Sequence, residues 1–218
     1  CAVIIEPIQG ESGILPATQE YLQAARRLCD KHGALLILDE VQTGMGHTGK
    51  LFAYEHYGVT PDILSSAKAL GGGFPIGAIL TTDKIAPTFG PGTHGSTFGG
   101  NPMACAVGSR AFDIINAPET LAHVDQQGQK LQTALRELGE KTGIFKEVRG
   151  MGLLLGCVLA DKYEGKASEI TAAALKHGLM VLVAGANVVR FAPSLLLNDE
   201  DMAEGLKRFE AALAEWLA

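Results

Sequence analysis

The chain has few cysteines, no long apolar run and no excess of positive charge. No apolar stretch approaches the roughly 20 residues that a membrane span needs, and no signal peptide is visible. The net charge of −6 offers no electrostatic attraction to nucleic acid or to an anionic membrane. The four cysteines are scattered without CxxC spacing, which is typical of reduced cytosolic thiols, and the six histidines form no metal-ligand pattern. These absences predict a cytoplasmic protein without a metal site.

Length and composition favour a globular α/β protein. The 218 residues include 47% hydrophobic residues, 19% charged residues and 27 glycines, which is enough to build a large core and too apolar for a disordered chain. The sequence begins at Cys1 directly on a buried-strand pattern, with no initiator methionine. We therefore expect it to be the C-terminal part of a longer protein.

The order of apolar runs predicts two domains. Strands expected at 2–5, 34–38, 63–65 and 76–81 alternate with helices through short loops, as in a doubly wound, mostly parallel sheet. The continuous β-branched run at 2–5 predicts a strand covered on both faces. After a long polar helix that begins at Pro118, the pattern changes to shorter strands and two helices, which predicts a small α+β domain. The predicted boundaries are 1–117 and 118–218.

One lysine and one aspartate follow buried strands. Asp39 ends the strand at 34–38, and Lys68 follows the strand at 63–65 and precedes Gly71, Gly72 and Gly73. Because the carboxyl ends of parallel strands share one edge of a sheet, both side chains can face one pocket there. We expect a lysine among small and apolar residues to be shielded from water and able to act as a nucleophile. A carboxylate and an amine in one dry site suit pyridoxal phosphate, whose aldehyde binds the amine and whose ring nitrogen binds the carboxylate. A structural ion pair is the plainer alternative, although buried pairs often add little stability.

The glycine-spaced loop after Asp39 partly matches two nucleotide-binding motifs. Gly44, Gly46 and Gly49 fit GxGxxG, but they do not stand at a strand–helix junction and no acid ends the next strand at the required distance. Gly44 and Gly49-Lys50 nearly form a Walker A loop, but Leu51 stands where serine or threonine should bind Mg²⁺. Both matches are weak, and a P-loop ATPase fragment is kept only as an alternative.

Several motifs together resemble the class III aminotransferases, which are fold type I pyridoxal-phosphate enzymes. The similarity runs in order from the first residues to the last helix, and it places this chain in the second half of the large domain and in the small domain. The matching motifs are EPIQGESG at 6–13, LDEVQTG at 38–44, SAKALGGG at 66–73, HGSTFGGNP at 94–102 and VRFAP at 189–193.

The resemblance implies a role for each of several residues. Lys68 would be the Schiff-base lysine and the proton-transferring base, and Asp39 would pair with the pyridine nitrogen. Gln42 would contact the phenolic oxygen of the cofactor, with Glu6 behind it.

The resemblance also implies a homodimer and a substrate switch. The loop containing Ser96 and Thr97 would reach the cofactor phosphate of the neighbouring subunit. Glu11 and Arg190 would pair and exchange partners as amine and 2-oxo-acid substrates alternate, because an arginine fork suits a carboxylate.

Within the family, the chain resembles most the members that act on acylated ornithines. This implies transfer of the δ-amino group of N²-acetylornithine or N²-succinylornithine to 2-oxoglutarate, in arginine metabolism. The family's phosphate-binding turn and ring-stacking aromatic residue are absent, so we expect the 218 residues alone to be inactive. Alternatives are an ornithine or 4-aminobutyrate aminotransferase, an aminomutase, and a non-catalytic remnant that only dimerises.

Overall fold

The computed structural model describes residues 1–218, and the chain divides into two compact units. Unit 1 comprises Cys1–Pro7, Ala17–Gly46 and Lys50–Pro118, and unit 2 comprises Ile8–Pro16, His47–Gly49 and Glu119–Ala218. The short segments 8–16 and 47–49 thus group with the C-terminal residues, although the sequence places them in the first domain. The domain boundary at 117/118 stays a prediction.

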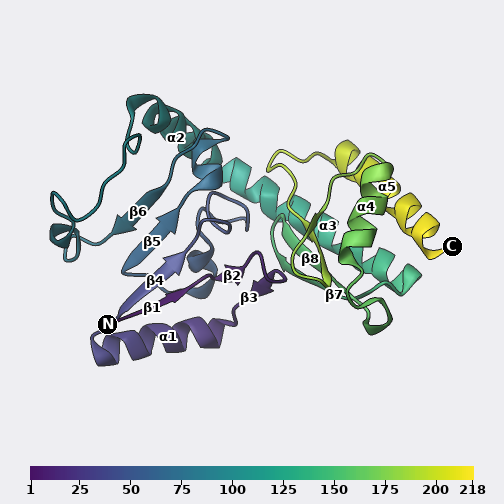
Figure 1. Ribbon diagram of the computed structural model, residues 1–218, viewed down its shortest axis with the longest axis horizontal. Helices are drawn as coiled ribbons and strands as arrows, with labels where there is room; N and C mark the ends of the chain where they lie inside the picture. Colours follow the sequence, from purple (N-terminus) through teal and green to yellow (C-terminus); the bar gives the residue numbers. More distant parts are fainter. The chain divides into compact units, whose positions relative to one another are not determined.

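Unit 1 is built on a four-stranded sheet in the order β1-β4-β5-β6 (Figure 1). β1, β4 and β5 are parallel, and β6 is antiparallel to β5. The mostly parallel sheet expected from the sequence is therefore confirmed. The elements of unit 1 are β1 (Ala2–Ile5), α1 (Gln19–His32), β4 (Leu35–Asp39), η1 (Ala53–Tyr57), β5 (Ile63–Ser66), η2 (Lys68–Gly71), β6 (Ala78–Thr81), η3 (Ala86–Thr88) and α2 (Pro102–Ile115).

Local sequence signals explain where the helices of unit 1 begin and end. Thr18 caps α1 by accepting a hydrogen bond from the Tyr21 N–H, and Gly33 ends it in the left-handed conformation. Pro102 occupies the first turn of α2, where its missing N–H costs nothing. These ends match the sequence prediction.

Strand β1 departs from the expected burial. Val3 is 40% exposed and Ile4 is 69% exposed, so the prediction of a strand covered on both faces is wrong for this structure. The reason is topological, because β1 lies at the edge of the sheet and pairs only with β4.

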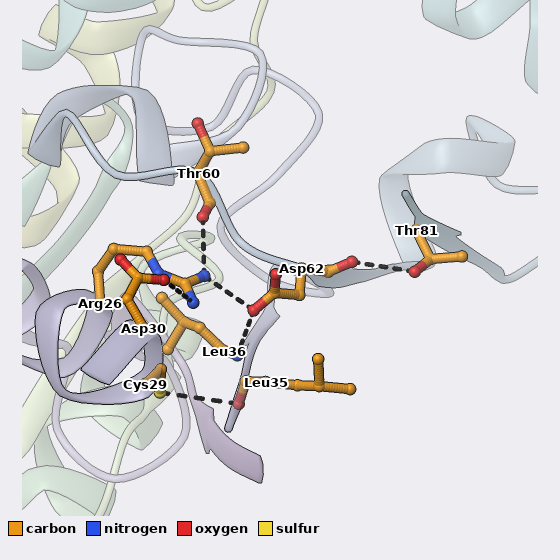
Figure 2. A network of polar contacts seen from close by, with 8 residues as sticks. All are labelled: Arg26, Cys29, Asp30, Leu35, Leu36, Thr60, Asp62 and Thr81. Carbon is orange, nitrogen blue, oxygen red and sulfur yellow. Dashed lines mark hydrogen bonds and ion pairs between the residues drawn. The ribbon is translucent and has the colours of Figure 1, made fainter. Parts of the chain in front are cut away.

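A polar network fixes the amino-terminal ends of β4 and β5 (Figure 2). The Asp62 carboxylate accepts hydrogen bonds from Arg26 of α1 at 2.8 Å and from the Leu36 N–H at 2.7 Å. The Asp62 carbonyl accepts from the Thr81 hydroxyl at 3.0 Å. One helix and three strands are thus joined at a single aspartate.

Unit 2 contains an antiparallel sheet in the order β7-β8-β10-β9 and a two-stranded hairpin, β2-β3. The sequence did not reveal the hairpin, whose strands have two residues each. No helix of the chain is both long and apolar enough to cross a membrane. The elements of unit 2 are β2 (Ile8–Gln9), β3 (Leu15–Pro16), α3 (Pro118–Thr142, whose first residue belongs to unit 1), β7 (Phe145–Met151), β8 (Leu154–Leu159), η4 (Asp161–Tyr163), α4 (Ala167–Lys176), β9 (Leu182–Val183), β10 (Val188–Phe191) and α5 (Asp199–Leu217).

The side chains on the two faces of strand β8 belong to two different apolar clusters. Leu155, Cys157 and Leu159 belong to the main core with α3, α4 and α5. Leu154 and Val158 point the other way and form a smaller cluster with residues that include those of the hairpin. This alternation is the period of two expected of a strand buried on both faces.

Candidate active site

Three neighbouring strands of unit 1 end at the same edge of the sheet, and each is followed by a predicted site residue. Glu6 follows β1, Asp39 ends β4, and Lys68 lies two residues after β5. The register places Ile5 beside Leu38 and Asp39 beside Ser65. Lys68 is thus three residues past the strand partner of Asp39, which is at most about 11 Å of extended chain. The carboxyl edge of parallel strands is where open α/β sheets bind ligands.

Asp39 is held through one of its two carboxylate oxygens. Oδ1 accepts hydrogen bonds from the Ser65 hydroxyl at 2.9 Å and from the Val41 N–H at 3.0 Å. Both donors reach the same oxygen, so Oδ2 is left for a further donor. Sequence reasoning missed Ser65, because a serine in a strand is not by itself a mark of function.

The adjacent Glu40 has a structural task instead. It is 1% exposed, and its carboxylate accepts hydrogen bonds from the Thr43 hydroxyl and from the N–H groups of Ala53 and Tyr54, at 2.9 and 2.7 Å. Burial raises the pKa of the Glu40 carboxyl, and these hydrogen bonds oppose that rise. Of the two neighbouring acids, Asp39 is therefore the one available to a ligand.

Lys68 begins the short helix η2 with an unusual backbone conformation. Its φ angle is 50°, in the left-handed region that L-residues other than glycine rarely adopt. The turn behind it depends on the glycines, because a Cβ on Gly71 would lie 2.9 Å from the Ile76 side chain. Gly72 ends η2 in the left-handed conformation and lies against Ala111 of α2. The lysine backbone is thus held in a strained geometry by a tightly packed turn.

The expectation of a lysine shielded from water is wrong for this structure, because Lys68 is exposed. Its neighbours in the chain, Ala67 and Ala69, are too small to cover a long side chain. Gln42 is partly buried in the turn that follows β4, and Glu6 is partly buried beyond the end of β1. Both therefore lie at the same sheet edge as Asp39.

Ser96 and Thr97 belong to an exposed loop between η3 and α2. Ser96 accepts a hydrogen bond from the Gly99 N–H at 2.8 Å, which shapes the turn around Thr97. Ser96 also lines a cavity of about 700 Å³ next to β6. Asp39 and Lys68 are not among the lining residues, so the structure does not bring this loop together with them. The cavity is lined by Gly77, Ile79, Thr81, Ala86, Phe89, His94, Gly95, Ser96 and Gly99.

In unit 2, Glu11 and Arg190 form the ion pair expected from the sequence. Arg190 Nη1 lies 3.3 Å from Glu11 Oε2 and 3.4 Å from the carbonyl oxygen of Gly10. The arginine side chain is 13% exposed and the glutamate side chain is 75% exposed. A largely buried cation thus meets a solvated anion. The exchange of partners during a reaction stays a prediction.

The glycine-spaced loop does not have the geometry of a nucleotide-binding loop. No helix begins at Gly44, Gly46 or Gly49, and the next helical segment, η1, is a five-residue 3₁₀ turn that begins at Ala53. Phosphate-binding loops place the phosphate at the N-terminus of a helix. The structure therefore argues against the P-loop alternative.

Comparison with known proteins assigns the chain to a family. The family model described as "Aminotransferase class-III" matches residues 1–213. The acetylornithine aminotransferase of Neisseria meningitidis serogroup B (strain ATCC BAA-335 / MC58) is 82% identical over all 218 residues, which cover 55% of that protein. A protein of Pseudomonas aeruginosa named succinylornithine transaminase/acetylornithine aminotransferase is 58% identical over 99% of the chain and 53% of its own length.

A solved structure agrees with the sequence comparison. The crystal structure of N-acetylornithine aminotransferase from Stenotrophomonas maltophilia K279a superposes with a TM-score of 0.91 at 47% identity, covering 99% of this chain and 57% of that one. The fold class expected from the sequence is therefore confirmed. The chain spans about half the length of the relatives that it matches. Its match over nearly the whole sequence shows that the chain belongs to the class III aminotransferases.

Proposed function

We propose that the chain is part of a pyridoxal-phosphate-dependent aminotransferase that acts on N²-acetylornithine or N²-succinylornithine. The amino group would pass to 2-oxoglutarate, giving a semialdehyde and glutamate. The names of the similar proteins support the acylated amines over free ornithine. The observation that carries the proposal is the convergence of Asp39 and Lys68 on one edge of the unit 1 sheet.

The donor groups present fit pyridoxal phosphate, the cofactor of class III aminotransferases. Asp39 keeps Oδ2 for a ring N–H, while two donors hold Oδ1 in place. Lys68 offers a primary amine three residues past Ser65, the strand partner of Asp39. When bound, the cofactor supplies an electron sink for the substrate carbon.

Each site residue then has a task set by its chemistry. The Asp39 carboxylate would hold the proton of the ring nitrogen, and the Lys68 amine would hold the cofactor at its aldehyde group and would accept and return a proton at its Nζ. Gln42 would contact the phenolic oxygen of the cofactor, with Glu6 behind it. The exposed loop with Ser96 and Thr97 would serve the phosphate site of a second subunit in a cytoplasmic homodimer.

Arg190 and Glu11 suit a site that receives two different substrates. The Arg190 guanidinium can bind the distal carboxylate of the acceptor, 2-oxoglutarate. When the amine substrate is bound, Glu11 neutralises Arg190. The 3.3 Å contact between the two side chains supports this pairing.

The proposal is tested by replacing Lys68 with alanine in the full-length protein. We expect loss of the borohydride-reducible absorbance of bound cofactor and a fall in turnover of about 10³-fold or more, because both the nucleophile and the base are removed. Lys84→Ala, which replaces another exposed lysine of unit 1, should change neither. Undiminished transamination by Lys68→Ala would end the proposal.

A second measurement separates the possible substrates. Steady-state kcat/KM should be compared for N²-acetylornithine, N²-succinylornithine and free ornithine, with 2-oxoglutarate as the acceptor. We expect the acylated amines to be preferred. Product analysis distinguishes an aminomutase, which would form no glutamate.

A further inference from the structure

Two arginines and a glycine form a row across three strands of the unit 2 sheet. Gly156 of β8 pairs with Arg149 of β7 on one side and with Arg190 of β10 on the other. Residues opposite one another in adjacent strands project from the same face of a sheet. The two arginines therefore stand on either side of a position that has no side chain.

Ile14 fills the space above Gly156. A Cβ on Gly156 would lie 2.9 Å from the Cβ of Ile14 and 3.0 Å from Cγ1 of Val188. Ile14 is fully buried although its φ angle is 50°, which is costly for a β-branched residue. The fit of Ile14 against Gly156 thus holds the turn of the β2-β3 hairpin in a conformation that it would not adopt alone.

Arg149 binds the same turn through its backbone. Its Nε lies 3.0 Å from the Gly13 carbonyl oxygen and 3.1 Å from that of Ile14, and its Nη2 lies 2.8 Å from the Gly13 oxygen. Its Nη1 is 3.1 Å from Glu147. Three nitrogens of one planar group are thus occupied, an arrangement that a lysine cannot reproduce.

The hairpin turn is consequently held on both sides of Glu11. Arg149 holds Gly13 and Ile14, and Arg190 contacts the Gly10 oxygen and the Glu11 carboxylate. Glu11 itself is largely exposed, so its own side-chain packing does little to keep it near Arg190. The position of the turn determines how often the two charges meet.

We propose that Arg149, Gly156 and Ile14 are positioning residues that set the Glu11–Arg190 contact and thereby the balance between the two substrates. This inference rests on the proposed function of that pair. With the turn released, Glu11 neutralises Arg190 less often. A substrate carboxylate then meets a more available cation, while the amine substrate meets an uncompensated charge.

The test compares Arg149→Lys and Gly156→Ala with the unchanged full-length protein. For both variants we expect the KM for the acylornithine to rise at least threefold, while the KM for the acceptor, 2-oxoglutarate, falls. Control variants are Arg208→Lys and Gly205→Ala on α5. Arg208 also donates to a backbone carbonyl, that of Gly178, and a Cβ on Gly205 meets only ordinary contact. Neither control should change the ratio between the KM values for the two substrates.

A third variant separates positioning from the effect of added bulk. Ile14→Gly removes the side chain that packs against Gly156, and glycine tolerates the positive φ angle. Because the turn loses its contact with Gly156, Ile14→Gly should shift the KM ratio in the same direction as Gly156→Ala. Equal increases in KM for both substrates, or a lower melting temperature with an unchanged KM ratio in Arg149→Lys, would show a purely structural role and overturn the inference.

Binding of glutarate, which has both carboxylates but no reacting carbonyl, gives a readout that needs no turnover. Calorimetry on the full-length protein should show tighter glutarate binding by Arg149→Lys, at least threefold. This measurement can be interpreted even if transamination of acylornithines is not observed. Failure of the proposed function and failure of this inference can therefore be told apart. Unchanged or weaker glutarate binding by Arg149→Lys would overturn the inference.

Discussion

The Ser65 hydroxyl of β5 donates a hydrogen bond to Asp39 Oδ1 of β4 at 2.9 Å, and this contact orients the carboxylate at the sheet edge. The Val41 N–H donates to the same oxygen at 3.0 Å. Because two donors hold Oδ1, they also fix the direction in which Oδ2 points. Under the proposed function, Asp39 could therefore receive the ring N–H of the cofactor at Oδ2 without turning.

Replacing Ser65 with alanine should weaken cofactor binding. Hydrogen bonds to charged groups contribute about 1.5–3 kcal/mol, and Asp39 is only partly buried, so we expect about a tenfold rise in the Kd for pyridoxal phosphate. Titration of the cofactor-free full-length protein, followed by absorbance, measures this. Ser66→Ala is the matched control, because the Ser66 hydroxyl is buried without a hydrogen-bond partner. A Ser65 variant that binds as tightly as the Ser66 variant would contradict the role given to Ser65.

The strained backbone of Lys68 predicts an unusual order of stability. Lys68→Gly should be more stable than Lys68→Ala by roughly 0.5–1 kcal/mol, because glycine adopts a φ angle of 50° without the Cβ penalty. Denaturant unfolding of the two variants measures the difference, and neither retains the amine. At Lys84, where φ is not positive, the order should reverse. Finding alanine the more stable at position 68 would mean that the turn relaxes and stores no strain.

The sequence predicted the parts of the site that strand ends determine. Asp39 and Lys68 could be placed together because apolar runs mark β4 and β5, and parallel neighbours end at the same edge. The caps Thr18 and Gly33 were likewise predicted, since their chemistry is local. The exposure of Lys68 was not predicted, because burial depends on which elements cover a side chain and not on its immediate neighbours.

The hairpin of unit 2 shows where sequence patterns fail. β2 and β3 have two residues each, which is too short for any alternation to be visible. Ile14 carries no sign that it adopts a positive φ angle, because isoleucine is among the residues least suited to it. The contact with Gly156 and the hydrogen bonds from Arg149, both far along the chain, hold that conformation.

The network in Figure 2 predicts a pH-dependent contribution to stability. Burial alone would raise the pKa of Asp62, but the hydrogen bond from the Leu36 N–H and the ion pair with Arg26 outweigh it and lower the pKa below its ordinary value. A lowered pKa in the folded state means that the unfolded chain binds the proton more readily. The stabilisation is therefore complete above the unfolded pKa and is lost as the pH falls through the folded value.

Asp62→Asn should accordingly destabilise the protein by about 1–3 kcal/mol at pH 7, because the Arg26 guanidinium and the Leu36 N–H lose their charged acceptor. The difference from the unchanged protein should begin to shrink as the pH falls below about 4, where the unfolded chain takes up the proton, and should be lost at the lower pH where the native carboxylate is protonated. Denaturant unfolding at a series of pH values measures both effects. Asp30→Asn removes the second carboxylate that pairs with Arg26. The Asp30 side chain is 64% exposed, and its replacement should cost only about 0.3–0.5 kcal/mol. A cost at Asp62 that is independent of pH would contradict the role given to its charge.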